Sequence, residues 1–341
     1  MNNFRLIVAA SCVAALAAGC GGGSKTSAAP AASGIPTAAV KITAANASTV
    51  AKGAVNSSQA AVNQSGQASA VGAMVTSSSN RRSVKDIALM NFARARNAKL
   101  SPSVLGAVTN VPATACATSG TVSMSMNDVN GDGTMGNGDS LTINFAACSD
   151  GATVENGSLT FAITSLSGQM GTAGTPGAPL TASFKMTFVN FSSTDVATNA
   201  KDSMNGDITF ATSDDGDTTT GTMSGTSLTT VSSIDGTSQM SNYSISFSDT
   251  ISTSGYGFGI GMTTADAAMG GSVTIATPTQ FTGTGAGDPT AGVMTITGAG
   301  GSTLTLTAQA DGTTVTQVVD EDGAAGSIAP VTLASTTWAA L

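Results

Sequence analysis

The sequence predicts an all-β protein: a large antiparallel meander curled into a sandwich or an open barrel, preceded by a disordered tether and one short α-helix. From about residue 111 onward, apolar residues alternate with Ser, Thr or Gly, as in strands that have one face towards water. Only 9% of the residues are charged, 41 are glycine and none is histidine. This composition is typical of an exported β-rich protein rather than a cytosolic enzyme.

The alternation recurs often enough to predict roughly 12 to 15 strands. It is clearest over residues 159–163, 180–188, 243–247, 256–262 and 294–306. Because so long a sheet must curl to bury its apolar face, we expect the sandwich or open barrel. Turn dipeptides separate the strands, and we place hairpin turns at Asn156-Gly157, Asn205-Gly206, Asp215-Gly216, Asp235-Gly236, Gly270-Gly271, Gly300-Gly301 and Asp311-Gly312.

The first 19 residues have the three parts of an export signal. Arg5 provides the positive start, residues 6–18 form a short apolar stretch, and Ala17, Ala18 and Gly19 are the small residues before a cleavage site. The apolar stretch has 13 residues, which is too short to span a bilayer as a helix. We therefore assign residues 1–19 to a signal peptide.

The stretch from Ala17 to Cys20 resembles the lipobox of bacterial lipoproteins, although Leu16 lies one place earlier than the usual Leu. The resemblance implies cleavage before Cys20, lipidation of that residue and stable membrane anchoring by more than one acyl chain. No Asp follows Cys20 directly, which fits passage to the outer membrane of a Gram-negative bacterium. The alternative is an ordinary secretory signal cut near Ala18, with Cys20 left as a free thiol.

Two segments separate this signal from the strands. Residues 20–80 are rich in Ala, Ser and Gly and are expected to form a flexible tether, with a reach of roughly 40–45 Å. Residues 81–101 predict a basic amphipathic helix, in which Ser83 is the N-cap and Pro102 ends the helix. The helix either contacts anionic lipid headgroups or docks on the acidic domain that follows.

Charge divides the chain into two regions. Residues 1–99 hold 10 of the 12 basic residues and a single acid, whereas residues 100–341 hold two lysines and 19 acids. The second region therefore has a net charge of −17, which excludes nucleic acid as its partner. We assign residues 102–341 to one acidic β domain.

An acidic loop within this domain resembles the calcium loop of an EF-hand. The candidate ligands occupy loop positions 1, 3, 5, 7 and 12 and are Asp128, Asn130, Asp132, Thr134 and Asp139, with Thr134 contributing its carbonyl. The flanking residues predict strands rather than helices, so the resemblance covers only these 12 residues. A metal-free hairpin loop is the alternative, and we expect any calcium binding to be weak because position 12 is Asp rather than Glu.

The four cysteines suggest one disulfide. Cys12 leaves with the signal and Cys20 is lipidated, so Cys116 and Cys148 remain as a pair in an oxidising compartment. The apolar faces of the flanking strands match Met126 with Leu141, and this register does not place the two sulfurs opposite each other. A bulge near Ser119-Gly120 is therefore expected.

No catalytic constellation is visible in the sequence. The absence of histidine excludes Ser-His-Asp triads and Cys-His dyads. Glu155 and Glu321 are the only glutamates, and most acids fall in predicted turns. The sequence thus favours a non-enzymatic structural or interaction module of the cell envelope, resembling uncharacterised β-rich lipoproteins of Gram-negative bacteria. A carrier of a lipid or other apolar ligand is the alternative, and a carbohydrate-active enzyme is the third hypothesis.

Overall fold

The computed structural model describes residues 36–64, 108–132, 136–168, 180–233, 236–266, 268–285, 287–323 and 328–341. These residues belong to one compact unit, Ala32–Leu341, which is described by itself. The lipobox with Cys20, Cys12 and the predicted helix over residues 81–101 lie outside the described residues.

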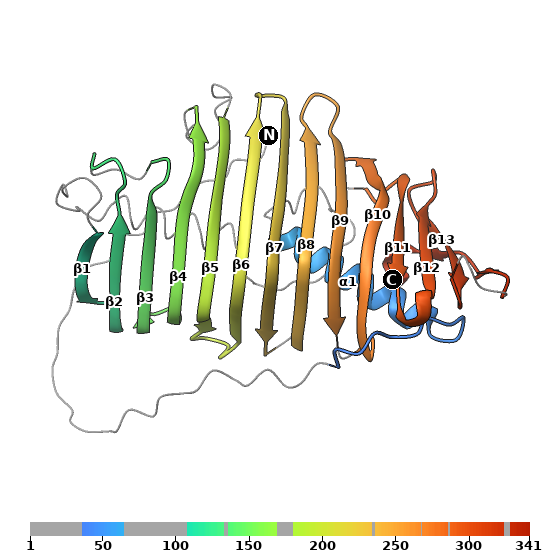
Figure 1. The fold of residues 1–341 in the computed structure, drawn as a ribbon, viewed down its shortest axis with the longest axis horizontal. Helices are drawn as coiled ribbons and strands as arrows, with labels where there is room; N and C mark the ends of the chain where they lie inside the picture. Colours follow the sequence, from blue (N-terminus) through green and yellow to red (C-terminus); the bar gives the residue numbers. More distant parts are fainter. Residues whose placement is uncertain are drawn as a thin grey trace. The chain divides into compact units, whose positions relative to one another are not determined.

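The described strands form a single antiparallel sheet of 15 strands (Figure 1). Its order follows the sequence from β1 to β14, and β15 pairs with β13. The predicted antiparallel meander is therefore confirmed. The strands are β1 (Val108–Ala115), β2 (Ser119–Asn127), β3 (Ser140–Ser149), β4 (Thr153–Ser167), β5 (Leu180–Asp195), β6 (Lys201–Asp214), β7 (Thr218–Ser232), β8 (Gly236–Thr250), β9 (Gly255–Asp266), β10 (Gly271–Thr284), β11 (Ala291–Thr297), β12 (Thr303–Ala308), β13 (Thr314–Asp320), β14 (Val331–Thr332) and β15 (Thr336–Thr337).

The sheet is open, with β1 at one edge and the short strands β14 and β15 beside β13 at the other. Short edge strands are one way in which proteins limit unwanted strand pairing. Residues 331–337 thus protect the β13 edge, where the Leu333 N–H also donates to the Gln317 carbonyl at 2.9 Å. Two short 3₁₀ helices, Ala299–Gly301 and Trp338–Ala340, complete this part of the chain.

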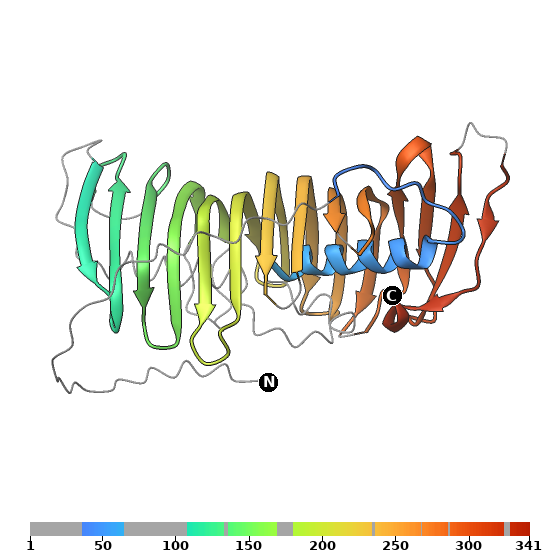
Figure 2. The same cartoon turned by 90° about the horizontal axis from the view of Figure 1, so that it is seen from below.

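The long strands curve because their register shifts near the middle (Figure 2). Ala147 on β3 and Asn190 on β5 adopt positive φ there, and these are the bulges that bend a sheet. Asn156 and Asn205 each accept a hydrogen bond from one of these bulged residues, at 2.8 Å from Ala147 N and 2.6 Å from Asn190 N. A row of asparagines therefore supports the bend.

Two of the predicted hairpin turns are wrong. Asn156-Gly157 and Asn205-Gly206 lie within β4 and β6 rather than in hairpin turns. Both glycines have positive φ and their backbones closely approach a neighbouring strand: a Cβ on Gly157 would lie 2.2 Å from the Asn190 carbonyl oxygen. The Asn-Gly pair is thus used here for a bulge, which requires the same left-handed backbone as a turn.

The apolar core lies on the inner face of the curved sheet. Aromatic rings lie directly over glycines of neighbouring strands. A Cβ on Gly221 would lie 2.1 Å from the ring of Phe247, and a Cβ on Gly292 would lie 2.4 Å from the ring of Phe281. Ring-to-ring contacts continue across the sheet, with centroids 5.1 Å apart for Phe184 and Phe210. Glycine in these strands therefore makes room for a ring from the next strand.

One helix, α1 (Ala47–Gln64), packs on the inner face of the C-terminal half of the sheet (Figures 1 and 2). Its buried face consists of small residues, and its contacts are with β8, β9 and β12. The side of the helix towards the core includes Ala51, Ala54 and Val55, each 0% exposed. Among the residues that the structure describes, no helix has the length and apolarity needed to cross a membrane.

Residues 47–64 form the packed helix α1, whereas a flexible tether was expected over residues 20–80. The sequence shows Gly53 and several Ser and Asn, which weaken an isolated helix. Tertiary packing outweighs this weakness, because Gly53 is buried and faces Met269. The preceding chain is also fixed, through hydrogen bonds from Val40 N to the Ser272 carbonyl at 3.0 Å and from Ile42 N to Ser302 Oγ at 2.9 Å.

Candidate functional site

The predicted calcium loop connects β2 to β3 at one end of the sheet. The register of these strands pairs Met126 with Leu141 and Val122 with Phe145, as the apolar pattern predicts. The register shifts between Ser119 and Thr121, which confirms the expected bulge near Gly120. The loop is therefore carried by two strands rather than by the two helices of an EF-hand.

Asp139 and Asp128, at the two ends of the loop, are buried. Asp139 is 0% exposed, and its two carboxylate oxygens accept backbone N–H groups from Val129 at 2.7 Å and Gly136 at 2.6 Å. Asp128 is 1% exposed, and its Oδ1 accepts the Gly131 N–H at 2.6 Å. Hydrogen bonds to the ionised form stabilise a buried carboxylate. The backbone N–H groups of the loop therefore stabilise these two buried carboxylates in part.

The other candidate ligands are placed differently. Asn130 and Asp132 are exposed and bond to each other, with Asn130 Nδ2 donating to Asp132 Oδ2 at 3.0 Å. Thr134 lies outside the described residues. Within the described part of the chain, no three acidic, histidine or cysteine side chains gather closely enough to form a metal site.

This arrangement fits a calcium ion only in part. The buried pair, Asp128 and Asp139, supplies hard oxygens of the kind that calcium prefers. However, both carboxylate oxygens of Asp139 already accept a backbone N–H. These hydrogen bonds stabilise the buried carboxylate without a metal ion. A cation would add its ligands mainly from the exposed side, through Asn130 and Asp132. Calcium binding therefore stays a prediction, and the metal-free turn stays its alternative.

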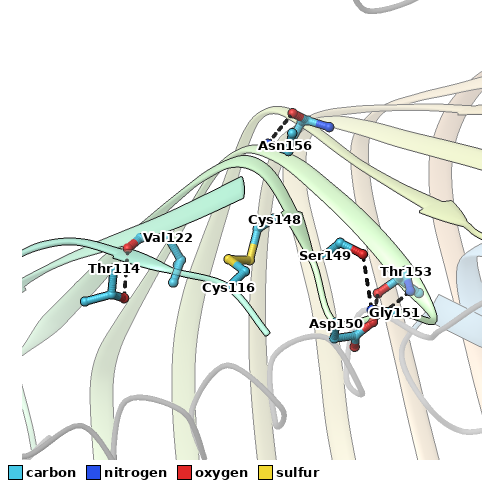
Figure 3. Close-up of a disulfide and its surroundings, with 10 residues drawn as sticks. Thr114, Cys116, Val122, Cys148, Ser149, Asp150, Gly151, Thr153 and Asn156 are labelled. Atoms are coloured by element: carbon cyan, nitrogen blue, oxygen red, sulfur yellow. Dashed lines mark hydrogen bonds between the residues drawn. A yellow bond between two sulfur atoms is a disulfide. The ribbon is translucent and has the colours of Figure 1, made fainter. Parts of the chain in front are cut away.

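A disulfide joins Cys116 to Cys148 (Figure 3). The Cα atoms are 5.4 Å apart, within the range normal for disulfides, and the predicted pairing is confirmed. Cys116 follows β1 and its N–H donates to the Gly120 carbonyl at 3.0 Å. Cys148 directly follows the bulged residue Ala147 on β3. The bridge therefore ties the end of β1 to the bend of the sheet.

Most described acids near the strand ends act as hydrogen-bond acceptors in turns. Asp150, Asp195, Asp215 and Asp311 each accept a backbone N–H from a Thr three residues later. Hydrogen bonds from Thr314 and Thr313 lower the pKa of the exposed Asp311 to about 2. The pKa of Asp215 is lowered in the same way, first by the Thr218 N–H. These carboxylates shape hairpins, as short Asx motifs do.

Two tyrosines form polar contacts that the sequence did not reveal. Tyr243 donates its hydroxyl to the Asp207 carbonyl, and burial raises its pKa above the usual range. Lys185 Nζ lies 3.8 Å from Asp207 Oδ2. Because Lys185 is half exposed, this ion pair contributes little stability. Periodicity indicates which residues share a face, but it gives no signal for such a bond between strands.

Tyr256 forms a similar contact at the β10–β11 loop. Its hydroxyl donates to the Gly287 carbonyl at 2.7 Å. Burial, followed by the charge of Asp288, raises its pKa to about 12. Burial also raises the pKa of Asp288. Both tyrosines therefore remain neutral at physiological pH and serve as hydrogen-bond donors rather than as bases.

Side chains of α1 and of the strands beneath it leave little room at one place in the interior. A cavity of about 10 Å³ lies between the helix and β9–β11, and it is lined by Ser58, Gln59, Val62, Phe258, Ile260, Phe281, Met294 and Trp338. This is scarcely room for one water molecule. Trp338 is 3% exposed and closes the core near the C-terminus. A lipid or other apolar ligand would not fit at this place.

No protein-family model matches the chain, and searches of curated proteins and of solved structures gave no match.

Proposed function

We propose that this protein is an exported lipoprotein, anchored in the membrane through Cys20, whose acidic β domain is a structural or interaction module of the cell envelope. The observation that carries the proposal is the Cys116–Cys148 disulfide, because disulfides of this kind persist in oxidising compartments outside the cytosol. The lipobox supplies the anchor, and the absence of Asp after Cys20 directs it to the outer membrane.

Two further observations support a module that is not an enzyme. The described acids near the strand ends bond to turn amides, as Asp150 and Asp311 do, instead of facing one another as the paired acids of a glycosidase would. One cavity beneath α1 has a volume of about 10 Å³, which is too small for an apolar ligand at that place. We rank the structural or interaction module first, the carrier of an apolar ligand second and a carbohydrate-active enzyme third.

The docked helix changes the expected geometry of the anchor. The first described residue, Pro36, lies 16 residues after Cys20, and the chain contacts β10 directly afterwards through Val40 and Ser272. Even fully extended, 16 residues span at most about 53–58 Å, which sets an upper limit on the distance between Cys20 and the docked chain.

Metabolic labelling with a fatty acid tests the anchor. The full chain is expressed in a Gram-negative host beside Cys20→Ala, with Cys12→Ala as the matched control. We expect label and membrane association in the wild type and the control, and neither in Cys20→Ala. An unlabelled wild type, or a labelled Cys20→Ala chain, would contradict the lipid anchor.

The compartment is tested separately by counting thiols on the exported protein. If Cys116 and Cys148 form a disulfide in the cell, neither reacts with a thiol reagent until a reductant is added. Two reactive thiols in the untreated protein would contradict export to an oxidising compartment.

A further inference from the structure

We propose that the inner apolar face of β2–β6 is a docking surface for residues 81–101 of the same chain. This face carries a group of half-buried apolar side chains that border the core: Val122, Met124, Phe184, Met204 and Phe210. The helix α1 contacts β8, β9 and β12 instead. The inner face therefore offers apolar contacts in a region that lies beyond the helix.

The path of the chain leads the segment to this face. Before α1, Ile42 is bonded to Ser302 next to β12, and Ala44 N donates to Glu321 at the end of β13. Near the end of α1, Ser58 and Val62 line a cavity with Phe258 of β9. The helix thus runs from the β13 side of the sheet towards β8. Residues 65–107 then have to reach β1, which begins at Val108 on the opposite edge.

The predicted helix has the length required to lie across these strands. Residues 83–100 would form a helix about 27 Å long. Neighbouring strands are about 4.8 Å apart, so the helix would cover between five and six strand spacings. This is close to the width of six neighbouring strands, namely β2–β6 and one strand beside them. Ile87, Met90 and Phe92 give the segment an apolar surface, which matches the half-buried apolar residues of the sheet.

Charge complementarity favours the same occupant. The segment contains six basic residues, Arg81, Arg82, Lys85, Arg94, Arg96 and Lys99, and one acid, Asp86. On the sheet, Glu155 is paired with Ser193, which is paired with Asp202 on the next strand. Glu155 is 3% exposed. Glu155 and Asp202 thus place two negative charges close together on these strands, and the positive charge of the segment complements them.

Hydrogen–deuterium exchange of the full chain in a zwitterionic detergent tests the proposal. We expect the amides of residues 81–101 to exchange at least tenfold more slowly than an unstructured peptide, without any anionic lipid. Met90→Asp/Phe92→Asp is expected to abolish this protection, whereas the matched control Asn91→Asp, which adds a charge between these two positions, is expected to keep it.

Three results would overturn the proposal: unprotected amides in the wild type, protection that appears only when phosphatidylglycerol vesicles are added, or protection that survives Met90→Asp/Phe92→Asp. The second result would assign the segment to the membrane surface. The test does not require lipidation, so it can fail while the proposed anchor stands.

Methionine oxidation by hydrogen peroxide examines the sheet side. Deleting residues 81–101 is expected to raise the oxidation rates of Met124 and Met204 severalfold, while Met294, buried beside α1, keeps its rate. Unchanged rates at Met124 and Met204 would overturn the proposal. If the oxidation rate of Met294 rises as well, the deletion has opened the whole sheet. The hydrogen–deuterium exchange of residues 81–101 in the intact chain then decides whether the segment docks.

Discussion

The two halves of the sheet bury similar apolar strands in different ways. Over β11–β13 the strands are short and pair without a register shift, and their inner residues, such as Leu304 and Leu306, are 0% exposed. The N-terminal half has longer strands, bulges at Ala147 and Asn190, and a disulfide at its edge. Among the described residues, a helix covers one half, whereas the other half shows bulges and a covalent link at its edge. Alternation alone therefore predicts the strands but not the means by which the core is closed.

The largest effect should come from disturbing the helix that closes the C-terminal half. Val55 is 0% exposed on the buried side of α1. We expect Val55→Asp to lower the free energy of unfolding by at least about 4 kcal/mol, because it buries an unpaired charge. Chemical denaturation followed by circular dichroism would measure this loss.

Asn56→Asp is the matched control, because it adds the same charge at the next, exposed position. Its expected change lies within about 0.5 kcal/mol. Equal losses in the two variants would contradict the packing of α1 on the sheet.

Removing the disulfide should have the next largest effect, and it should act in the other half. The cysteines are 32 residues apart, and closing a loop of this size stabilises the folded state by about 3–4 kcal/mol in the chain-entropy model. We expect Cys116→Ala/Cys148→Ala to lose that amount, with faster amide exchange first in β1–β3. Faster exchange in β11–β13 to the same extent would show that the two halves unfold as one unit.

The bend can be tested with a pair of glycines that share a backbone conformation. Gly157 has φ +91° in the bulge and Gly216 has φ +96° in a turn. A Cβ at Gly157 would lie 2.2 Å from the Asn190 carbonyl oxygen, whereas a Cβ at Gly216 would meet nothing within 4 Å.

We expect Gly157→Ala to reduce stability by about 2–3 kcal/mol and Gly216→Ala by about 1 kcal/mol, the cost of positive φ alone. Thermal melting of both variants would measure the difference. If the two variants melt together, close approach of the strands does not contribute to the bend.

The features that could be predicted from the sequence are those that depend on repetition. Alternating residues predicted the strands, and the faces of Met126 and Leu141 predicted the register and the bulge near Gly120, both confirmed. Each of these follows from local pattern, because a shift of one residue would turn every side chain to the opposite face.

Features that depend on the fold as a whole could not be predicted in this way. Asn156-Gly157 has the composition of a turn, and only the neighbouring strands decide that it forms a bulge. The sequence of α1 is weakly helical, and tertiary contacts such as that between Gly53 and Met269, which the local sequence does not reveal, compensate for this weakness. For the calcium loop, the spacing of the residues indicated the oxygen atoms but not the backbone amides that bond to Asp139.

The smallest expected effect is that of calcium on this loop, and the structure allows its two possible roles to be separated. Asp139 is buried and bonded to two backbone amides, whereas Asp132 is exposed. Asp139→Asn should therefore destabilise the domain even without calcium, because the NH₂ group that replaces one carboxylate oxygen cannot accept an N–H. Asp132→Asn should leave the metal-free protein nearly unchanged.

If the loop binds calcium with a dissociation constant on the order of 10⁻⁴–10⁻³ M, ~1 mM calcium stabilises the wild type by about 0.4–1.4 kcal/mol. Asp132→Asn should lose part of this gain, since it removes one negative charge from the ligand set, on which calcium affinity depends, without disturbing the buried pair. Melting temperatures of the wild type and Asp132→Asn, measured in a chelator and in ~1 mM calcium, provide the comparison. An equal calcium response in both proteins would place the ion elsewhere. No response in the wild type up to ~10 mM would favour the metal-free turn, because the amide donors to Asp128 and Asp139 would then be sufficient to hold the buried charges.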